Sequence, residues 1–229
     1  MLPHAPATSA SFATRLVGLF ALGIYIKSMS SITYRRASGA ELDRYLGDLA
    51  RLRIAVFRDY PYLYDGSLDY EHDYLRTYAS VPGSVVVLAL DGERVVGAAT
   101  GLPLISETPE VQGPFLALGY DPAQVFYFGE SVLLSQYRGH GVGVRFFLER
   151  EAHARAVGPF QWTCFCAVER PADHPRRPSD HVPLDAFWSK RGYRKHPELR
   201  THFSWKEIDE PAESEKEMVF WLKRHEVVA

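Results

Sequence analysis

The sequence is poor in cysteine and has no excess of charge of either sign. Its 229 residues include two cysteines, and 26 Lys plus Arg against 28 Asp plus Glu give a formal net charge of -2. A nearly neutral chain has no overall positive field for nucleic acid or an anionic membrane, so a basic site must be local. Cys164 and Cys166 fall in an apolar run typical of a strand, on one face and poorly spaced for a disulfide. We therefore predict free thiols and a cytoplasmic protein.

The N-terminal apolar stretch, Leu16 to Ile26, is too short to span a bilayer as a helix. Three origins of residues 1–28 remain open: an over-extended translation start, since Met29 leads directly into a first strand, a signal or anchor, and a helical appendage. We assign 1–28 to an N-terminal extension and 29–229 to one domain, for which we expect no membrane association.

From residue 32 onward, strand and helix patterns alternate without repeats, low-complexity tracts or a long linker, which indicates a single α/β domain. The patterns predict strands over residues 32–36, 84–90, 94–100, 125–134, 160–168, 201–207 and 218–223. They predict helices over 38–56, 70–78, from the glycines at 139–143 to 157, and over 184–190. Residues 103–122 are expected to be irregular, with at most a short helix.

Three local signals refine this arrangement. Ser38 and Glu41 have the spacing of a capping box at the start of the first helix. Asp91-Gly92 between two β-branched runs predicts an antiparallel hairpin. The strand, helix and strand after residue 125 predict a parallel pair with a right-handed crossover, so the sheet is mixed.

The segment Gln136-Tyr137-Arg138-Gly139-His140-Gly141-Val142-Gly143 lies between a strand and a helix. Glycines allow backbone amides to approach an anion, and a helix N-terminus adds its unpaired amides and positive dipole end. An NTPase phosphate loop would need Gly-Lys-Ser/Thr, which is missing. A dinucleotide fingerprint would need Gly-x-Gly-x-x-Gly early in a βαβ unit, and this pattern comes late and differs. The third interpretation is Gln/Arg-x-x-Gly-x-Gly/Ala, whose amides surround the pyrophosphate of coenzyme A.

On this motif the chain resembles the GNAT superfamily of acyl-coenzyme A N-acyltransferases, and Phe187-Trp188-Ser189-Lys190-Arg191-Gly192-Tyr193 resembles a later segment of that family. The resemblance covers residues 32–223. It implies an α+β domain with a mixed, splayed, mostly antiparallel sheet of about six to seven strands and about four helices. It also implies acetyl transfer from acetyl-coenzyme A directly to an amine of a small molecule or peptide.

The resemblance assigns cofactor contacts to two segments and one aromatic residue. Amides of the glycine loop would bind the pyrophosphate, with the charge of Arg138 at its rim; these residues are Arg138, Gly139, His140, Gly141, Val142 and Gly143. The strand residues Val132, Leu133 and Leu134 would splay from the strand at Cys164 and Cys166, leaving a slot for the pantetheine arm. Amides near Leu133 would stabilise the thioester oxyanion. Trp188 would pack against the arm.

Proton transfer needs a base, because an amine is protonated at neutral pH. Glu130, an acid within an apolar strand, is the first catalytic candidate, and burial would raise its pKa. The alternative is a glutamate that faces solvent or pairs with an arginine. Glu169 and His181 are further candidates for the base.

The general acid departs from the family, since many members place Tyr where this chain has Trp188. An indole cannot protonate the leaving thiolate, although a thiol with a pKa of about 8.5 already leaves as the anion. Tyr193, Tyr127 or Cys166 could substitute, although nothing in the spacing selects one and core packing is the favoured explanation of each. The two cysteines keep a ping-pong route open.

Tyr60, Tyr62 and Tyr64 interleave with Asp59 and Asp65 after the first helix, which in the resembling family borders the acceptor. Aromatic faces and carboxylates suit a cationic amine, although the tyrosines could equally anchor a loop.

Asp173-His174 and Asp180-His181 could be metal ligands, but no cysteine or third histidine stands at ligand spacing, so we expect no metal. The predicted protein is thus an N-acetyltransferase that uses acetyl-coenzyme A, with no nucleic-acid partner and with a homodimer left open. The rival hypothesis is a non-catalytic acyl-coenzyme A binding or regulatory module.

Overall fold

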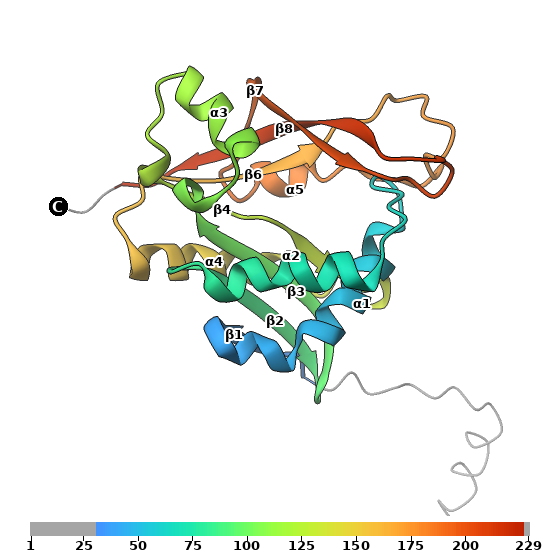
Figure 1. Ribbon diagram of the computed structural model, residues 1–229, viewed down its shortest axis with the longest axis horizontal. Helices are drawn as coiled ribbons and strands as arrows, with labels where there is room; N and C mark the ends of the chain where they lie inside the picture. The colour runs from blue at the N-terminus through green and yellow to red at the C-terminus, as the bar shows by residue number, and fades with distance from the viewer. Residues whose placement is uncertain (1–30, 227–229) are drawn as a thin grey trace, which may run out of the picture. The chain divides into compact units, whose positions relative to one another are not determined.

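The computed structural model describes residues 31–226, and the predictions made for 1–28 lie outside these residues. Eight strands form one sheet in the order β1-β2-β3-β4-β6-β8-β7, with β5 paired to β3 beside this path (Figure 1). The strands are β1 (Thr33–Ala37), β2 (Val85–Asp91), β3 (Arg94–Pro103), β4 (Val125–Tyr127), β5 (Ser131–Leu133), β6 (Trp162–Val168), β7 (Arg194–Trp205) and β8 (Ser214–Arg224). Only β4 and β6 are parallel among the strand pairs of this part of the chain.

The helices lie in the predicted regions, with one addition. The α-helices are α1 (Leu46–Phe57), α2 (Leu68–Ser80), α3 (Pro109–Ala117), α4 (Val142–Val157) and α5 (Asp185–Ser189). Short 3-10 turns are η1 (Gly39–Arg44), η2 (Leu104–Ser106), η3 (Pro122–Gln124) and η4 (Ser135–Tyr137). The segment expected to be irregular therefore holds η2, α3 and η3. The structure confirms a mixed, mostly antiparallel sheet, with eight strands rather than six or seven.

Two local predictions have different outcomes. The Asp91-Gly92 hairpin is confirmed, since β2 and β3 pair up to Asp91 and Arg94. The capping box is wrong: the Ser38 side chain makes no cap hydrogen bond, and a 3-10 turn, η1, precedes α1. The polar start of the helix is thus a separate tight turn whose Leu42 is buried in the core.

The sheet has a hydrophobic core on each face. On one face α1, α2 and α3 contribute Leu49, Leu75 and Phe115 to a cluster that also contains Tyr127 and Cys166. On the other face α4 supplies Phe146 and Phe147, and residues of α5 pack at the edge of that cluster. Side chains of one strand alternate between these two cores, so the strands between them can carry groups to either face.

Candidate active site

The predicted strand over residues 125–134 divides into two strands that part from each other. β4 pairs with β6 in parallel over three residues, and the last bond runs from the Phe128 amide to the Cys164 carbonyl at 2.7 Å. After Phe128 the chain turns away, and β5 pairs with β3 alone. No pairing joins β5 to β6 among residues 31–226. The predicted splay between the two strands is therefore present.

The hydrogen-bond pattern of β5 leaves alternate amides facing the separated side. The Leu134 amide donates to Val96 at 3.0 Å, and the Glu130 carbonyl accepts from Thr100 at 3.0 Å, so these even-numbered residues face β3. Antiparallel pairing alternates along a strand. The amides of Ser131 and Leu133 consequently point toward β6, where no strand pairs with them. Two N–H dipoles in this position can bind a carbonyl or an oxyanion.

The glycine loop follows β5 and η4 and leads into α4. Gly139 and Gly141 have φ values of +80° and +82°, a left-handed conformation that favours glycine, and a Cβ on either would meet no atom within 4 Å. Gly141 is the N-cap of α4, whose first amides have no acceptor within the helix. The loop thus offers open space, free amides and a positive helix end, which fits a pyrophosphate.

Arg138 lies at the edge of this loop, and its backbone amide is not free to bind a ligand. That amide donates to the Ser135 carbonyl at 3.1 Å, so the series of available amides begins at Gly139 rather than at the predicted Arg138. The exposed guanidinium of Arg138 lies 3.4 Å from the Leu133 carbonyl and 3.9 Å from the Asp59 carboxylate. Its charge is therefore placed between the loop and the end of α1.

A buried arginine on α4 supports the point where the strands part. Arg150 is 2% exposed. Its Nη1 donates to the carbonyls of Thr100 and Glu130, and its Nη2 donates to Ser131 Oγ at 2.9 Å. Its guanidinium also lies 4.2 Å from the ring centre of Phe128. The side chain thus contacts both sides of the break.

Glu130 is buried and ion-paired. Its carboxylate contacts Arg53 of α1, which also pairs with Glu71 of α2, and all three side chains are at most 8% exposed. The Tyr74 hydroxyl donates to Glu130 at 3.3 Å. Of the two alternatives for Glu130, a solvent-facing side chain does not apply, while pairing to an arginine does.

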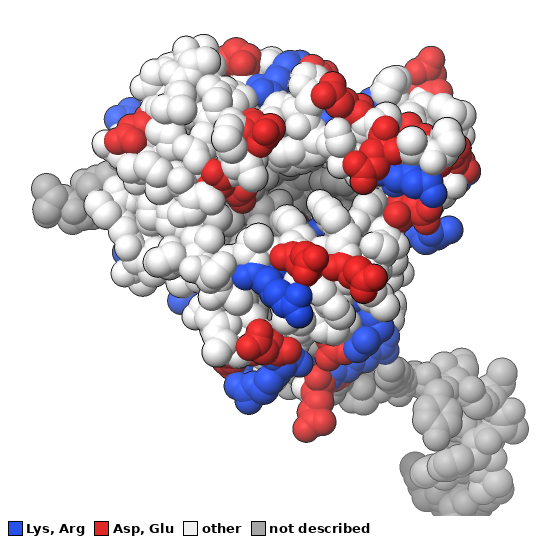
Figure 2. Space-filling model, in the orientation of Figure 1, with Lys and Arg blue, Asp and Glu red and all other residues white. Residues whose placement is uncertain are grey.

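Phenol groups cover the break on the α2 side. The hydroxyls of Tyr74 and Tyr78 lie 3.0 Å apart. A Cβ on Gly129 would overlap the Tyr78 hydroxyl, so glycine is needed for this close approach. Tyr127 and Cys166 lie in the same core, with 3.2 Å between hydroxyl and sulfur. Figure 2 shows this face hollowed between α2 and the β7 and β8 strands, with acidic side chains on both sides of the hollow.

One further carboxylate, in the segment between β3 and β4, is partly buried. Burial raises the pKa of Glu107, which follows η2. Its charge in turn raises the pKa of Tyr74, Tyr78 and Tyr127, beyond the effect of their own burial. Glu107 is not among the residues predicted from the sequence, because its segment has no periodic pattern that indicates which side chains point inward.

The three tyrosines predicted for the acceptor side lie in different surroundings. Tyr62 packs on Phe57 and Trp205 and against the core cluster that contains Cys166, and burial raises its pKa. Burial raises the pKa of Tyr64 as well, and Glu71 is the next cause. Tyr60 instead contacts the rings of His174 and His181, 5.6 and 4.7 Å away.

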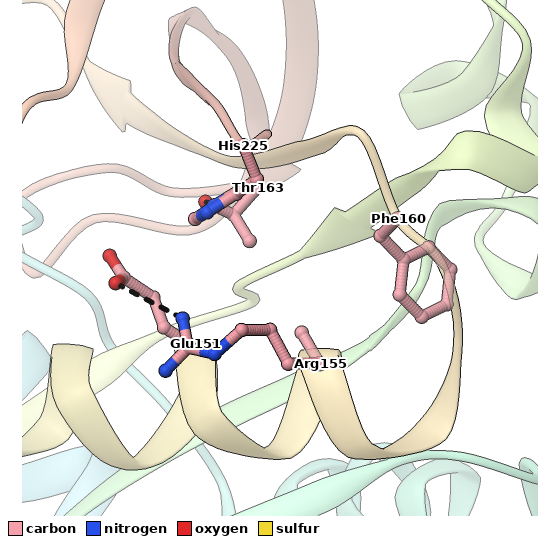
Figure 3. A pocket seen from close by; sticks show the side chains of 6 residues that line it. Glu151, Arg155, Phe160, Thr163 and His225 are labelled. Atoms are coloured by element: carbon pink, nitrogen blue, oxygen red, sulfur yellow. Dashed lines mark hydrogen bonds and ion pairs between the residues drawn. The ribbon is translucent and has the colours of Figure 1, made fainter. Parts of the chain in front are cut away.

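Trp188 and Tyr193 both lie on the α4 side of the sheet. Trp188 packs on Phe165 and Trp221 at 5.1 Å each. The Tyr193 hydroxyl lies 2.8 Å from Thr163 Oγ1 and donates to Glu151 at 3.2 Å. Figure 3 shows Glu151 and Thr163 at a small cavity of about 10 Å³, which has room for about one water. These bonds favour the core-packing interpretation of Tyr193 over a general acid.

The remaining candidates lie in the loop after β6. Lys195 and Arg200 pair with Glu169, and these ion pairs lower its pKa, which opposes a role as base. Burial, and then Arg177, lower the pKa of His181. The two histidines of this loop both contact the Tyr60 ring, and among the described residues there is no group of three or more His, Cys, Asp or Glu that could hold a metal ion.

Comparisons with known proteins identify the fold. No protein-family model matches the sequence, and no curated protein is similar to it. Among solved structures, ribosomal-protein-alanine N-acetyltransferase from Brucella melitensis matches with a TM-score of 0.55 and 15% identity over 84% of this chain and 99% of that chain. NAA60 from Arabidopsis thaliana, in complex with acetyl-CoA, matches with a TM-score of 0.55 and 14% identity over 85% of this chain and 98% of that chain. A GNAT-family acetyltransferase from Streptococcus pneumoniae matches with a TM-score of 0.53 and 11% identity over 85% of this chain and 99% of that chain.

The chain therefore has the fold of GNAT-family acetyltransferases, which confirms the fold that its motifs predicted. Within residues 31–226, no helix is long and apolar enough to cross a membrane.

Proposed function

We propose that this protein is an N-acetyltransferase that transfers the acetyl group of acetyl-coenzyme A directly to an amine. One observation carries the proposal. The chain separates from β6 after Phe128, continues as β5, and then leads through η4 into the glycine loop at the N-terminus of α4. The slot, with its unpaired amides, suits the pantetheine arm of the cofactor. The anion site at the end of the slot suits the pyrophosphate. Residues 29–229 would form the catalytic domain, which we place in the cytoplasm.

Each predicted cofactor residue has a physical role in this proposal. The amides of Gly139, His140, Gly141, Val142 and Gly143 bind the pyrophosphate, and the Arg138 guanidinium adds charge at the rim. The amides of Ser131 and Leu133 bind the arm and the thioester oxygen, while Val132 fixes β5 through its buried side chain. Trp188 borders the arm from α5, and Leu134 ends β5 with its bond to Val96.

A direct transfer suits the chemistry of the two cysteines. Burial raises the pKa of Cys166 to about 12 and raises that of Cys164 well above its ordinary value, so both are protonated thiols at neutral pH. A thiol is a much weaker nucleophile than a thiolate. We therefore propose attack by the amine itself, without an acetyl-enzyme. Of the three predicted tyrosines, Tyr62 packs against the core that contains Tyr127 and Cys166, and we propose it as the residue that borders the acceptor.

The acceptor in this proposal is a primary amine, which is cationic before it reacts. Acidic side chains around the hollow in Figure 2 and the phenol rings of its interior would attract an ammonium group. A small-molecule amine and a peptide amine both satisfy this chemistry. The protein's partners are then acetyl-coenzyme A and such an amine, with a homodimer left open.

Coenzyme release in the presence of amines tests the proposal. We expect free thiol to appear from acetyl-coenzyme A when spermidine, a peptide with a free N-terminus or a lysine peptide with a blocked N-terminus is present. Acetyl-coenzyme A, but not NAD or ATP, should raise the melting temperature. Binding without turnover across such a panel would instead favour a non-catalytic acyl-coenzyme A module, the rival suggested by Trp188 at the position of the acid.

A further inference from the structure

The glycine loop is followed by a third glycine whose presence the backbone does not explain. Gly139 and Gly141 have the left-handed conformation, whereas Gly143 lies in the first turn of α4 and has no positive φ. A Cβ on Gly143 would lie 3.2 Å from Cζ of Phe187, which is closer than most Cβ contacts. Glycine at this position therefore allows the Phe187 ring of α5 to lie directly against the start of α4.

An arginine lies on this ring. The guanidinium carbon of Arg191, just after α5, is 3.7 Å from the ring centre of Phe187, which is within the range of a cation–π contact. Arg191 Nη1 donates to the Phe187 carbonyl at 2.6 Å. The ring also packs on Phe147 of α4, with 5.9 Å between the ring centres. These contacts hold the guanidinium one phenyl ring away from the first turn of α4.

Most donors of this guanidinium remain free among residues 31–226. An arginine has five N–H donors in a planar fork, and the side-chain hydrogen bond of Arg191 uses Nη1. Its Nε is buried and has no hydrogen-bond partner. No ion pair of the described residues includes Arg191. A carboxylate therefore does not neutralise its charge, whereas Arg138 at the same loop lies 3.9 Å from Asp59.

We propose that Arg191 binds the 3′-phosphate of coenzyme A and thereby selects this cofactor over forms that lack the group. The inference rests on the proposed function, which places the pyrophosphate of the cofactor at the same loop. Coenzyme A carries a phosphate monoester on its ribose besides the pyrophosphate, and at neutral pH a monoester has a charge of about -1.5 to -2. A guanidinium suits this group because its planar fork binds two phosphate oxygens at once.

The pyrophosphate has its own partners in the proposed function, namely the amides from Gly139 to Gly143 and the guanidinium of Arg138. The ribose phosphate has a separate charge and needs a separate donor. Arg191 supplies free N–H groups next to the start of α4, and the Phe187 ring restricts where they lie. A side chain ordered before the ligand arrives loses less conformational entropy on binding.

The alternative role of Arg191 is purely structural, as a donor to the last turn of α5. That role uses the Nη1 bond to the Phe187 carbonyl and leaves the other donors without a task. A structural role affects the stability of the fold and the binding of every cofactor form alike. A phosphate contact instead affects only the forms that carry the phosphate.

Calorimetry with coenzyme A and with 3′-dephospho-coenzyme A tests the inference without turnover. The unmodified protein should bind coenzyme A about 10–100-fold more tightly, which is the effect of hydrogen bonds between charged groups. In Arg191→Met the affinity for coenzyme A should fall to that for the dephospho form, while the affinity for the dephospho form should not change. Arg191→Lys keeps the charge without the planar fork and should retain part of the preference.

Arg44→Met is the matched control, because it removes the same charge from η1, which packs on the other face of the sheet from α5. Arg44 has a side chain that is 69% exposed and lies 3.6 Å from Glu41. This variant should keep the full preference for coenzyme A. The ratio of the two affinities is measured on folded protein, so a lower melting temperature of Arg191→Met does not affect it.

Three results would overturn the assignment and leave acetyl transfer intact. The first is equal binding of the two cofactors by the unmodified protein. The second is an equal loss of affinity for both in Arg191→Met, which would place the guanidinium on the pyrophosphate. The third is a preference that Arg191→Met retains in full. If the unmodified protein binds neither cofactor, the proposed function and this inference fail together.

Discussion

Arg150 Nη1 donates a hydrogen bond to the backbone carbonyl of Glu130 at 3.0 Å, from within the core between α4 and the sheet. The same atom lies 3.2 Å from the Thr100 carbonyl, so one guanidinium joins β3 to the segment that leaves β6. Burial lowers the pKa of Arg150 to about 10, which still leaves it charged at neutral pH. Its hydrogen bonds to carbonyls and a hydroxyl, without a carboxylate, compensate that charge.

Replacing this arginine should lower the stability of the fold. Arg150→Met leaves buried carbonyls with fewer donors, which should lower the free energy of unfolding by about 1–3 kcal/mol in urea denaturation. Arg145→Met on the same helix is the control, because Arg145 is half exposed and its pair with Glu149 should contribute about 1 kcal/mol or less. Equal losses in the two variants would contradict the role given to Arg150.

The glycine loop should bind coenzyme A through backbone that a side chain would block. Gly141→Glu places a negative charge and a side chain where the pyrophosphate is proposed to lie, so coenzyme A should no longer raise the melting temperature. Gly119→Glu is a matched control: its φ is +78°, a Cβ there also meets nothing within 4 Å, and it lies beyond α3. Both variants should lose about 1–2 kcal/mol through backbone strain.

The outcome depends on the difference between these two glycine variants. Coenzyme A should stabilise Gly119→Glu as it stabilises the unmodified protein. A ligand-induced shift that survives in Gly141→Glu would show that the loop has been assigned incorrectly.

The two thiols should remain unacetylated. Because burial raises the pKa of Cys166 to about 12, its thiolate fraction at pH 7.5 is far too small for a nucleophilic step. After incubation with acetyl-coenzyme A alone, the intact mass of the protein should be unchanged. An added acetyl group mapped to Cys166 would favour a ping-pong route.

Glu107→Gln should stabilise the fold at neutral pH. A carboxyl group whose folded-state pKa is raised contributes stability that is present below its unfolded-state pKa and is lost as the pH rises through the folded-state value. Glutamine does not titrate and resembles the protonated form. The variant should therefore melt at a higher temperature than the unmodified protein at pH 7, with the difference shrinking toward pH 4. A variant that is less stable at pH 7, with no dependence on pH, would contradict the burial of this carboxylate.

Local signals in the sequence predicted much of the fold. The Asp91-Gly92 pair defines the hairpin because the turn depends on residues next to each other in the chain. The glycines of the loop were identified for the same reason, since left-handed backbone and a helix start are local properties. Features that depend on neighbouring residues in the chain could thus be predicted from the sequence.

The break between β4 and β5 could not be predicted in this way. Residues 125–134 are rich in aromatic and aliphatic side chains on both sides of Gly129-Glu130-Ser131, and this pattern predicts one strand unless distant groups intervene. Those groups are the Tyr78 hydroxyl against Gly129 and Arg150 on the Glu130 carbonyl, which come from α2 and α4. The position of the break is therefore a property of the tertiary structure.

Three charged residues of the site were missed for related reasons. Arg53 lies four residues after Leu49 and three before Val56, within the apolar stripe of its helix, and Arg150 follows Phe146 and Phe147 in the same way. An arginine within an apolar stripe is a usable signal of a buried functional charge. Glu107 gave no comparable signal, because its partial burial depends on how the short turn η2 packs against β4 and α3.

The most direct test of the central claim is to follow acetyl-coenzyme A and a primary amine together, by thiol release and by the mass of the amine. The account predicts that coenzyme A and N-acetylated amine appear in equal amounts, in a reaction that Gly141→Glu abolishes and Gly119→Glu does not. Acetyl-coenzyme A that binds and stabilises the protein, with no acetylated amine formed from spermidine or either peptide, would contradict it.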